Sequence, residues 1–266
     1  MTTLPFAIHP LHTVDLHHQG DCSILGILAD GALYAEEIYG DDCWMAQHFV
    51  DSSGVIQSSV DEADGHDAPI TPLAIPDSAV KPARVWHTMN LNFAGPRHRG
   101  LRGPEHLDAL VKTIPIAEKP ALIQLLGLSV PPPMLLGMAE SYVLSEAQVI
   151  APDWFIVCRR IRFAYALPTE QIDADGMPYD YDTRVLYAAH VYHRGDEEES
   201  FLAGLTDSPF APDLIRPMDC AIVGDRLYIG NGGSMESGVP SRIHIWSLER
   251  PEPPSPDEAW LKKLYG

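Results

Sequence analysis

Residues 21–35 read DCSILGILADGALYA, and residues 219–229 read DCAIVGDRLYI. Both segments open with Asp-Cys, a small residue and Ile, continue as an apolar strand, turn at an aspartate and resume with Leu-Tyr. A hairpin of this kind that cannot bury both of its faces needs similar neighbours to pack against. The two related segments therefore predict a fold built from repeated antiparallel units.

Short alternating stretches on either side extend this interpretation. Residues 21–58 predict one unit of three or four antiparallel strands, because β-branched and aromatic residues alternate between turn sequences. Residues 154–167 and 184–193 predict two long antiparallel strands joined by an acidic loop, and residues 208–248 predict a second repeat unit. Most of the chain is expected to be β-structure.

Two regions differ from this pattern. Residues 59–82 are acidic and rich in proline, which predicts a loop. Residues 103–138 predict a helical insertion, because Leu107, Leu110, Val111 and Ile114 follow helical spacing. We expect a single propeller-like domain over residues 1–250, followed by a proline-rich tail at 251–266. The alternative is a mixed α+β domain with two unrelated hairpins.

The distance between the related segments suggests how many units there are. Cys22 and Cys220 are 198 positions apart (220 − 22), and a propeller blade takes about 40–45 residues. Counting both ends, this spacing predicts a β-propeller of five or six blades, closed between its first and last units.

The segment RPMDCAIVGDRLYIGNGG at 216–233, followed by SRIHIWSLE at 241–249, resembles a blade of six-bladed propellers. The similar families are the senescence-marker-protein/gluconolactonase lactonases, the paraoxonases and the quinone-dependent glucose/sorbosone dehydrogenases. The resemblance covers about 75 residues, at the two ends of the chain. It implies that Asp21 and Asp219 point into a central channel, where they bind Ca²⁺ or act as a catalytic base.

The chain also departs from those families. Met218 stands where they often have Asn, and their Glu ligand has no clear counterpart, although Glu36 and Glu37 are near the expected position. The catalytic His and Arg of the quinone enzymes have no assignable equivalents either. The alternative is that Asp21 and Asp219 are turn acids that accept hydrogen bonds from backbone amides at strand starts.

A second candidate for calcium is the acidic loop IDADGMPYDYD at 172–182. It groups carboxylates around a glycine but lacks the EF-hand pattern and its closing Glu, so a hairpin tip explains it equally well. The candidate ligands are Asp173, Asp175, Asp180 and Asp182.

Histidines and cysteines give weaker indications of a metal site. His17/His18 and His190/His193 are one and three positions apart, so within a strand the members of each pair face opposite sides. A transition-metal site would need partners from elsewhere, such as His48 or His87. The cysteines contain no CxxC; Cys22 and Cys220 are expected to be buried free thiols, with a disulfide between them as the alternative.

The overall charge limits the classes of partner. The chain has 37 acidic residues against 18 Lys and Arg, for a net charge of −19, which disfavours nucleic acid and anionic membrane surfaces. No targeting segment is recognised, so a cytoplasmic location is expected. The motifs GxSxG, P-loop and GxGxxG are absent from the sequence.

These observations favour a non-catalytic acidic scaffold or interaction subunit, with a protein partner or a second copy of the chain. The alternative is a calcium-dependent lactone or ester hydrolase, in which Ca²⁺ polarises the carbonyl and an aspartate activates water. Asp21 and Asp219 would carry that chemistry.

Overall fold

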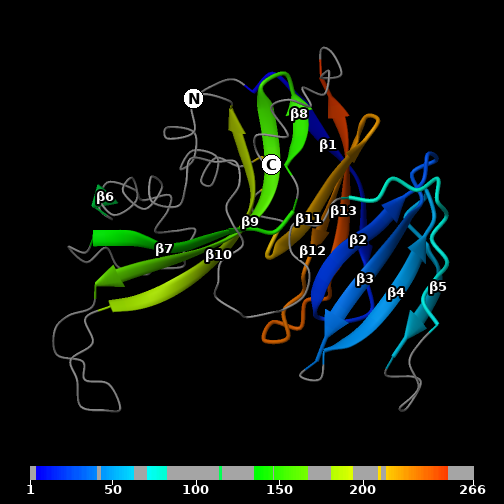
Figure 1. Cartoon of the computed structure of the whole chain (residues 1–266), viewed down its shortest axis with the longest axis horizontal. Helices are drawn as coiled ribbons and strands as arrows, with labels where there is room; N and C mark the ends of the chain where they lie inside the picture. The colour runs from blue at the N-terminus through cyan, green and yellow to red at the C-terminus, as the bar shows by residue number, and fades with distance from the viewer. Residues whose placement is uncertain are drawn as a thin grey trace.

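Three antiparallel sheets contain all the strands of the computed structural model, and the residues that it describes include no helix (Figure 1). The described residues are 4–40, 43–62, 71–82, 114–115, 135–145, 147–166, 181–193, 209–210 and 214–250. We refer to the sheets as A, B and C.

Sheet B is a four-stranded meander in which each strand pairs with the next along the chain. Tight turns connect the strands: Gly31 and Gly54 have positive φ angles of 94° and 83°, which glycine adopts without steric strain. The strands are β2 (Asp21–Ile27), β3 (Leu33–Tyr39), β4 (Trp44–Val50) and β5 (Ile56–Asp61).

Sheet A joins the two ends of the described chain. Its meander of β11 (Pro217–Val223), β12 (Arg226–Asn231) and β13 (Arg242–Glu249) is completed by β1 (Ala7–Asp15). Strand β1 pairs with β13 in antiparallel register from Ala7↔Glu249 to Asp15↔Arg242. In Figure 1 the dark blue β1 lies beside the orange-red β13. The pairing fixes the start of the chain to its C-terminal strands.

Sheet C is dominated by two long strands, β9 (Trp154–Ala166) and β10 (Tyr181–His193). They pair without a register shift from Tyr181↔Ala166 to His193↔Trp154. Strand β9 also pairs with β7 (Leu135–Val143) and β8 (Gln148–Ala151), and β7 pairs with the short β6 (Ile114–Pro115).

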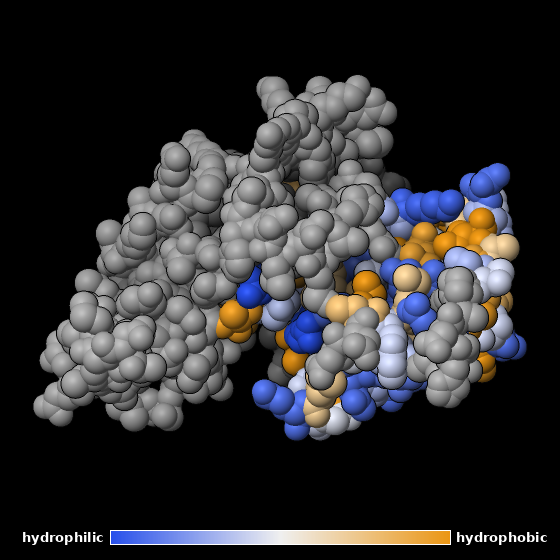
Figure 2. Space-filling view, turned by 60° about the horizontal axis from the view of Figure 1, so that its bottom comes forward, coloured by the Kyte–Doolittle hydropathy of each residue, from blue (hydrophilic) through white to orange (hydrophobic). Residues whose placement is uncertain are grey.

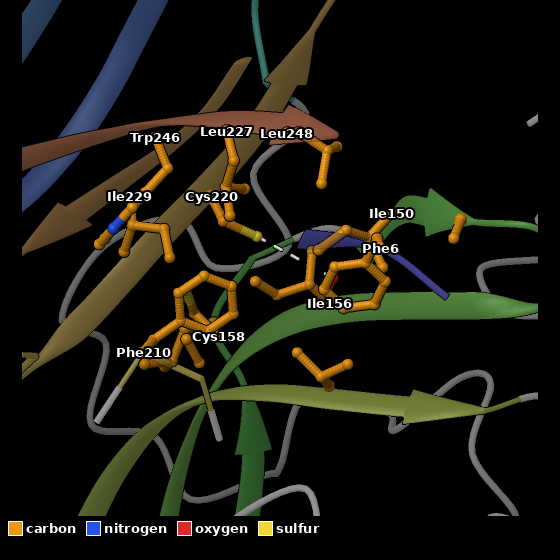
Figure 3. Close-up of a cluster of buried hydrophobic side chains, with 14 residues drawn as sticks. Phe6, Ile150, Ile156, Cys158, Phe210, Cys220, Leu227, Ile229, Trp246 and Leu248 are labelled. Atoms are coloured by element: carbon orange, nitrogen blue, oxygen red, sulfur yellow. Dashed lines mark hydrogen bonds between the residues drawn. The ribbon is translucent and has the colours of Figure 1, made fainter. Parts of the chain in front are cut away.

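Sheet A lies between the other two sheets and forms a hydrophobic core with each. Towards sheet C, buried residues of A pack against Ile150, Ile156 and Cys158 (Figure 3). Towards sheet B, residues such as Ile243 and Ile245 pack against Ile24 and Leu33. Burying two faces explains why β12 is buried from Leu227 to its end.

The related segments occupy corresponding places in two neighbouring sheets. Cys22 and Leu33 of sheet B lie in the core facing sheet A. Cys220 and Leu227 of sheet A lie in the core facing sheet C. The three sheets lie side by side in the order C, A, B. Cys220 and Leu227 of sheet A face sheet C, and Cys22 and Leu33 of sheet B face sheet A, so both pairs face the neighbouring sheet on the same side, as equivalent members of a repeat would.

The prediction of a mainly β fold is confirmed, as are the unit at 21–58 and the two long strands flanking the acidic loop. The described strands form three sheets rather than a ring of five or six blades. Within the expected helical insertion, residues 114–115 and 135–138 are strand, so helix is wrong there. Apolar spacing could not reveal that β6 pairs with β7. The rest of residues 103–138, and the tail at 251–266, lie outside the described residues.

Candidate functional site

A polar junction forms where the start of β2 meets sheet A. Gly233 N–H donates to Gly20 O at 2.8 Å, and Ser241 Oγ lies 3.0 Å from both Gly20 N and Gly20 O. A Cβ atom on Gly232 would come within 2.9 Å of Gly20 O. The two backbones approach this closely because glycine stands at these positions.

Arg216, just before β11, connects this junction to two other sheets. Its guanidinium forms an ion pair with Asp21 of sheet B and donates to Gly233 O at 3.2 Å. It also lies over the ring of Tyr187 in sheet C, with Cζ 5.3 Å from the ring centroid. One side chain therefore contacts elements of all three sheets.

Asp219 of sheet A also connects sheets A and B, through a hydrogen bond to the backbone of sheet B. The residue is 4% exposed, and its Oδ2 accepts a hydrogen bond from Ile24 N–H at 3.0 Å. A backbone amide of sheet B is thus satisfied by a side chain of sheet A. This agrees with the interpretation of Asp219 as an acid that binds backbone amides, although the amide belongs to a different sheet.

The junction is electrostatically unfavourable for negative charge despite Arg216. Burial raises the pKa of Asp21 above its usual value, and the Arg216 guanidinium offsets only part of that rise. Burial also raises the pKa of the Cys22 thiol well above its normal range, with further contributions from Glu37, Asp219 and Asp21. Cys22 is therefore an inert thiol, buried in the core between sheets A and B within the field of nearby carboxylates.

A second polar cluster lies where the loop before β2 covers the end of sheet B. Buried Glu37 accepts hydrogen bonds from the backbone N–H groups of His17 and His18, both at 3.1 Å. Its Oε2 lies 2.7 Å from His48 Nε2. His48 Nδ1 in turn lies 2.8 Å from Ser59 Oγ.

The same loop contributes a neighbouring hydrogen-bonded pair. His18 Nε2 lies 2.6 Å from Asp61 Oδ2, and the His18 ring stacks on Tyr39 at 3.7 Å between centroids. Tyr39 Oη donates to Asp61. The ring of His17 packs edge-on against His48 at 4.8 Å. The loop is held by side chains from β3, β4 and β5.

The structure brings some of the predicted site residues together. Asp21 and Asp219 lie at one junction, on either side of the contact between sheets A and B. His17, His18 and His48 also meet, as a site combining them would require. Asp173, Asp175 and Asp180 lie outside the described residues, as does His87, while Asp182 lies in β10.

The described residues contain no group of three or more His, Cys, Asp or Glu side chains arranged to hold a metal ion. In the histidine cluster, both ring nitrogens of His48 and the Nε2 of His18 already have hydrogen-bond partners. Cys22 and Cys220 are buried free thiols, as expected, and form no disulfide with each other.

Arg216 and Ser59 were not identified from the sequence. Arg216 lies in the quoted repeat segment, but a lone arginine before a strand gives no indication that it crosses to another sheet. Ser59 lies opposite His48 only because of the register shift between Phe49 and Val50; counting back across the turn from Val50↔Ile56 without that shift would place Ser58 opposite His48. Figure 2 shows a surface on the side of sheet B that mixes hydrophilic and hydrophobic residues, so hydropathy does not mark the site.

No family model, curated protein or solved structure matches this chain. Within the described part of the chain, no helix has the length and apolar character needed to cross a membrane.

Proposed function

We propose that the protein is an acidic interaction subunit built on a propeller-like stack of repeated sheets. The corresponding positions of Cys22 and Cys220 in consecutive sheets support the repeat. The pairing of β1 with β13 supports closure, because a propeller commonly completes one blade with strands from both ends of its chain. Such a stack presents loops and strand edges on which a partner can dock.

The distribution of charge supports a basic partner. Residues 1–80 contain 13 Asp and Glu and no Lys or Arg. Sheet B therefore has no fixed positive charge of its own. A surface of this kind attracts a basic partner and repels polyanions.

One observation carries the proposal: Asp21 and Asp219 are both engaged in contacts between sheets A and B. Asp21 pairs with Arg216, and Asp219 accepts from Ile24 N–H. A calcium-dependent hydrolase would need these oxygens for Ca²⁺ or for water. Their present partners favour a structural role, so the hydrolase alternative, with Asp21 and Asp219 as ligands or base, is second.

A calcium titration followed by thermal unfolding separates the two functions. The interaction subunit predicts no calcium-dependent rise in melting temperature. A rise that is present in the native protein and lost in both Asp21→Asn and Asp219→Asn would favour the hydrolase. Raising the magnesium concentration at equal ionic strength controls for non-specific screening.

The partner is tested by purifying the affinity-tagged full chain from cells of the source organism, without cross-linking, at low and at high salt. We expect a stable complex with a basic protein that dissociates as the ionic strength rises. Recovery of the chain alone, or of a complex insensitive to salt, would contradict an electrostatic docking function.

A further inference from the structure

Three neighbouring strands of sheet B place a carboxylate, an imidazole and a hydroxyl in one line. Glu37 comes from β3, His48 from β4 and Ser59 from β5. The contacts are 2.7 Å from Glu37 Oε2 to His48 Nε2 and 2.8 Å from His48 Nδ1 to Ser59 Oγ. Neither the proposed interaction function nor the junction at Asp21 uses these groups.

The hydrogen bonds determine the direction of donation along this line. Both oxygens of Glu37 already accept from backbone N–H groups of His17 and His18, so Glu37 acts as the acceptor towards His48. His48 Nε2 then carries the proton and donates to Glu37. In a neutral imidazole the other nitrogen is an acceptor, so Nδ1 accepts the hydroxyl proton of Ser59.

The burial of the three groups is graded. Glu37 and His48 have no exposed side-chain surface, whereas Ser59 is exposed. The imidazole is thus sheltered and fixed in orientation by the carboxylate, while the hydrogen bond that it forms with the exposed residue Ser59 is only partly buried. This is the arrangement of an activated nucleophile with its base and an orienting group.

The strand register adds a backbone donor. Glu62 N–H bonds Met45 O at 2.9 Å, and β4 and β5 pair regularly from Ala46↔Asp61 to Phe49↔Ser58. Hydrogen-bonded pairs alternate along an antiparallel ladder, so His48 and Ser59 form a non-hydrogen-bonded pair. The backbone N–H of Ser59 therefore points away from β4, towards the outer side of β5.

We propose that Ser59 is a nucleophile that accepts acyl groups from carboxylic esters, with His48 as its base and Glu37 as the positioning residue. Ser59 Oγ attacks the ester carbonyl carbon while His48 Nδ1 takes the hydroxyl proton. The N–H of Ser59 donates to the developing oxyanion. His48 returns the proton to the alcohol oxygen as its bond to the acyl carbon breaks.

Water completes the cycle. It attacks the acyl carbon of acyl-Ser59, His48 Nδ1 takes its proton, and the carboxylic acid leaves as that proton returns to Ser59 Oγ. The net reaction consumes one ester and one water and releases one alcohol and one acid. The chemistry needs no metal ligand from Asp21 or Asp219. Its test is therefore independent of the test of the proposed interaction function.

The adjacent Ser58 provides a matched control. It is also exposed, but successive residues of a strand face opposite sides of the sheet, so it lies away from His48. The full chain is treated with an alkyl fluorophosphonate, which phosphonylates activated serines. Cleavage on the N-terminal side of aspartates releases residues 51–60, and fragmentation of this peptide locates the label.

We expect the label on Ser59, at a rate about 100-fold or more above that of Ser58, since a positioned general base contributes that much. Ser59→Ala should lower labelling of this peptide to the rate of Ser58, whereas Ser58→Ala should leave the labelling rate of Ser59 unchanged. His48→Gln should lower the rate to that of Ser58. An unlabelled peptide, or equal labelling of the two serines, would overturn the proposal and leave Ser59 as a structural partner of His48.

Discussion

Replacing Arg216 with Met should destabilise the protein more than any other single loss of surface charge among the described residues. The side chains of Arg216 and Asp21 are only 30% and 24% exposed. A hydrogen bond to a charged group contributes about 1.5–3 kcal/mol, and a cation–π contact such as that with Tyr187 about 0.5–1 kcal/mol. We expect Arg216→Met to lower the free energy of unfolding by about 2–3 kcal/mol, after allowing for solvent screening.

The two partners should not be equivalent. Asp21→Asn leaves a guanidinium that can reach water, so it should cost about 0–1 kcal/mol. Arg216→Met leaves the partly desolvated carboxylate of Asp21 without its cation, so it should lower the free energy of unfolding more than Asp21→Asn does. In the double variant that penalty disappears. A double-mutant cycle from urea unfolding should therefore give a coupling energy of about 1–2 kcal/mol.

The pH dependence provides a separate check. The pKa of Asp21 is raised in the folded protein above 3.8, chiefly by burial. The folded state therefore holds its proton more tightly than the unfolded state, and the stability this provides is complete below pH 3.8. It is lost as the pH rises through the folded pKa. Without Arg216 the loss should be larger, so the deficit of Arg216→Met should grow from pH 4 towards neutrality.

Arg242 supplies the control. It pairs with Asp15 at 2.6 Å, but the side chains are 32% and 60% exposed, and such surface pairs contribute less than about 1 kcal/mol. If Arg216→Met cost no more than Arg242→Met, or if its deficit did not change with pH, the role of Arg216 as the cation of a partly buried junction would be refuted.

Three further outcomes follow from the packing and the turns. Ile24→Ala, in the core between sheets A and B, should cost about 2–5 kcal/mol in urea unfolding, whereas Val55→Ala, at a site 53% exposed, should change stability by less than about 0.5 kcal/mol. Hydrogen bonds from Ser53 and Val55 lower the pKa of Asp51 to about 2, so its NMR titration should have its midpoint near that pH, and its stabilising contribution should be lost as the pH falls from 3.8 through about 2. A thiol reagent should modify exposed Cys43 in the native protein and reach the other three cysteines, all buried, only on unfolding.

Local features of the fold could be predicted from the sequence. Alternation and turn residues sufficed for the hairpins of sheet B and for the pairing of β9 with β10, because adjacent strands need only a short connection. The pairing of β1 with β13 joins residues more than 200 positions apart. No local pattern encodes such a contact, and β1, most of whose residues are exposed, shows no apolar alternation that would select its partner strand.

In the candidate sites, too, local features could be predicted from the sequence, whereas contacts between distant segments could not. Asp21 and Asp219 could be selected because they begin related strands, yet their partners Arg216 and Ile24 come from other sheets. The contact between His48 and Ser59 depends on the register of one hairpin. A register shift between Phe49 and Val50 changes that register by one residue, and a one-residue slip moves each side chain to the opposite face. The sequence alone does not place such a bulge.

Asp219 allows a test of why the related segments begin with an acid. Ile24 N–H donates to Asp219 Oδ2 at 3.0 Å, and Ile222 N–H, at the corresponding position of sheet A, lies 3.5 Å from Gln148 Oε1 of sheet C. At both sheet contacts, a side-chain oxygen of one sheet therefore meets the same backbone amide of the next. At the second contact an amide oxygen suffices, so a negative charge is not required for this contact.

Asp219→Asn should consequently retain the hydrogen bond and fold with stability within about 1 kcal/mol of the native protein. Asp219→Ala leaves a buried N–H without its acceptor and should cost about 1–3 kcal/mol. Urea unfolding of the two variants measures the difference. A role as catalytic base or calcium ligand predicts instead that Asp219→Asn and Asp219→Ala lose activity or calcium binding equally, because both roles require the carboxylate. Equal destabilisation by the two substitutions would contradict the backbone-binding role of Asp219.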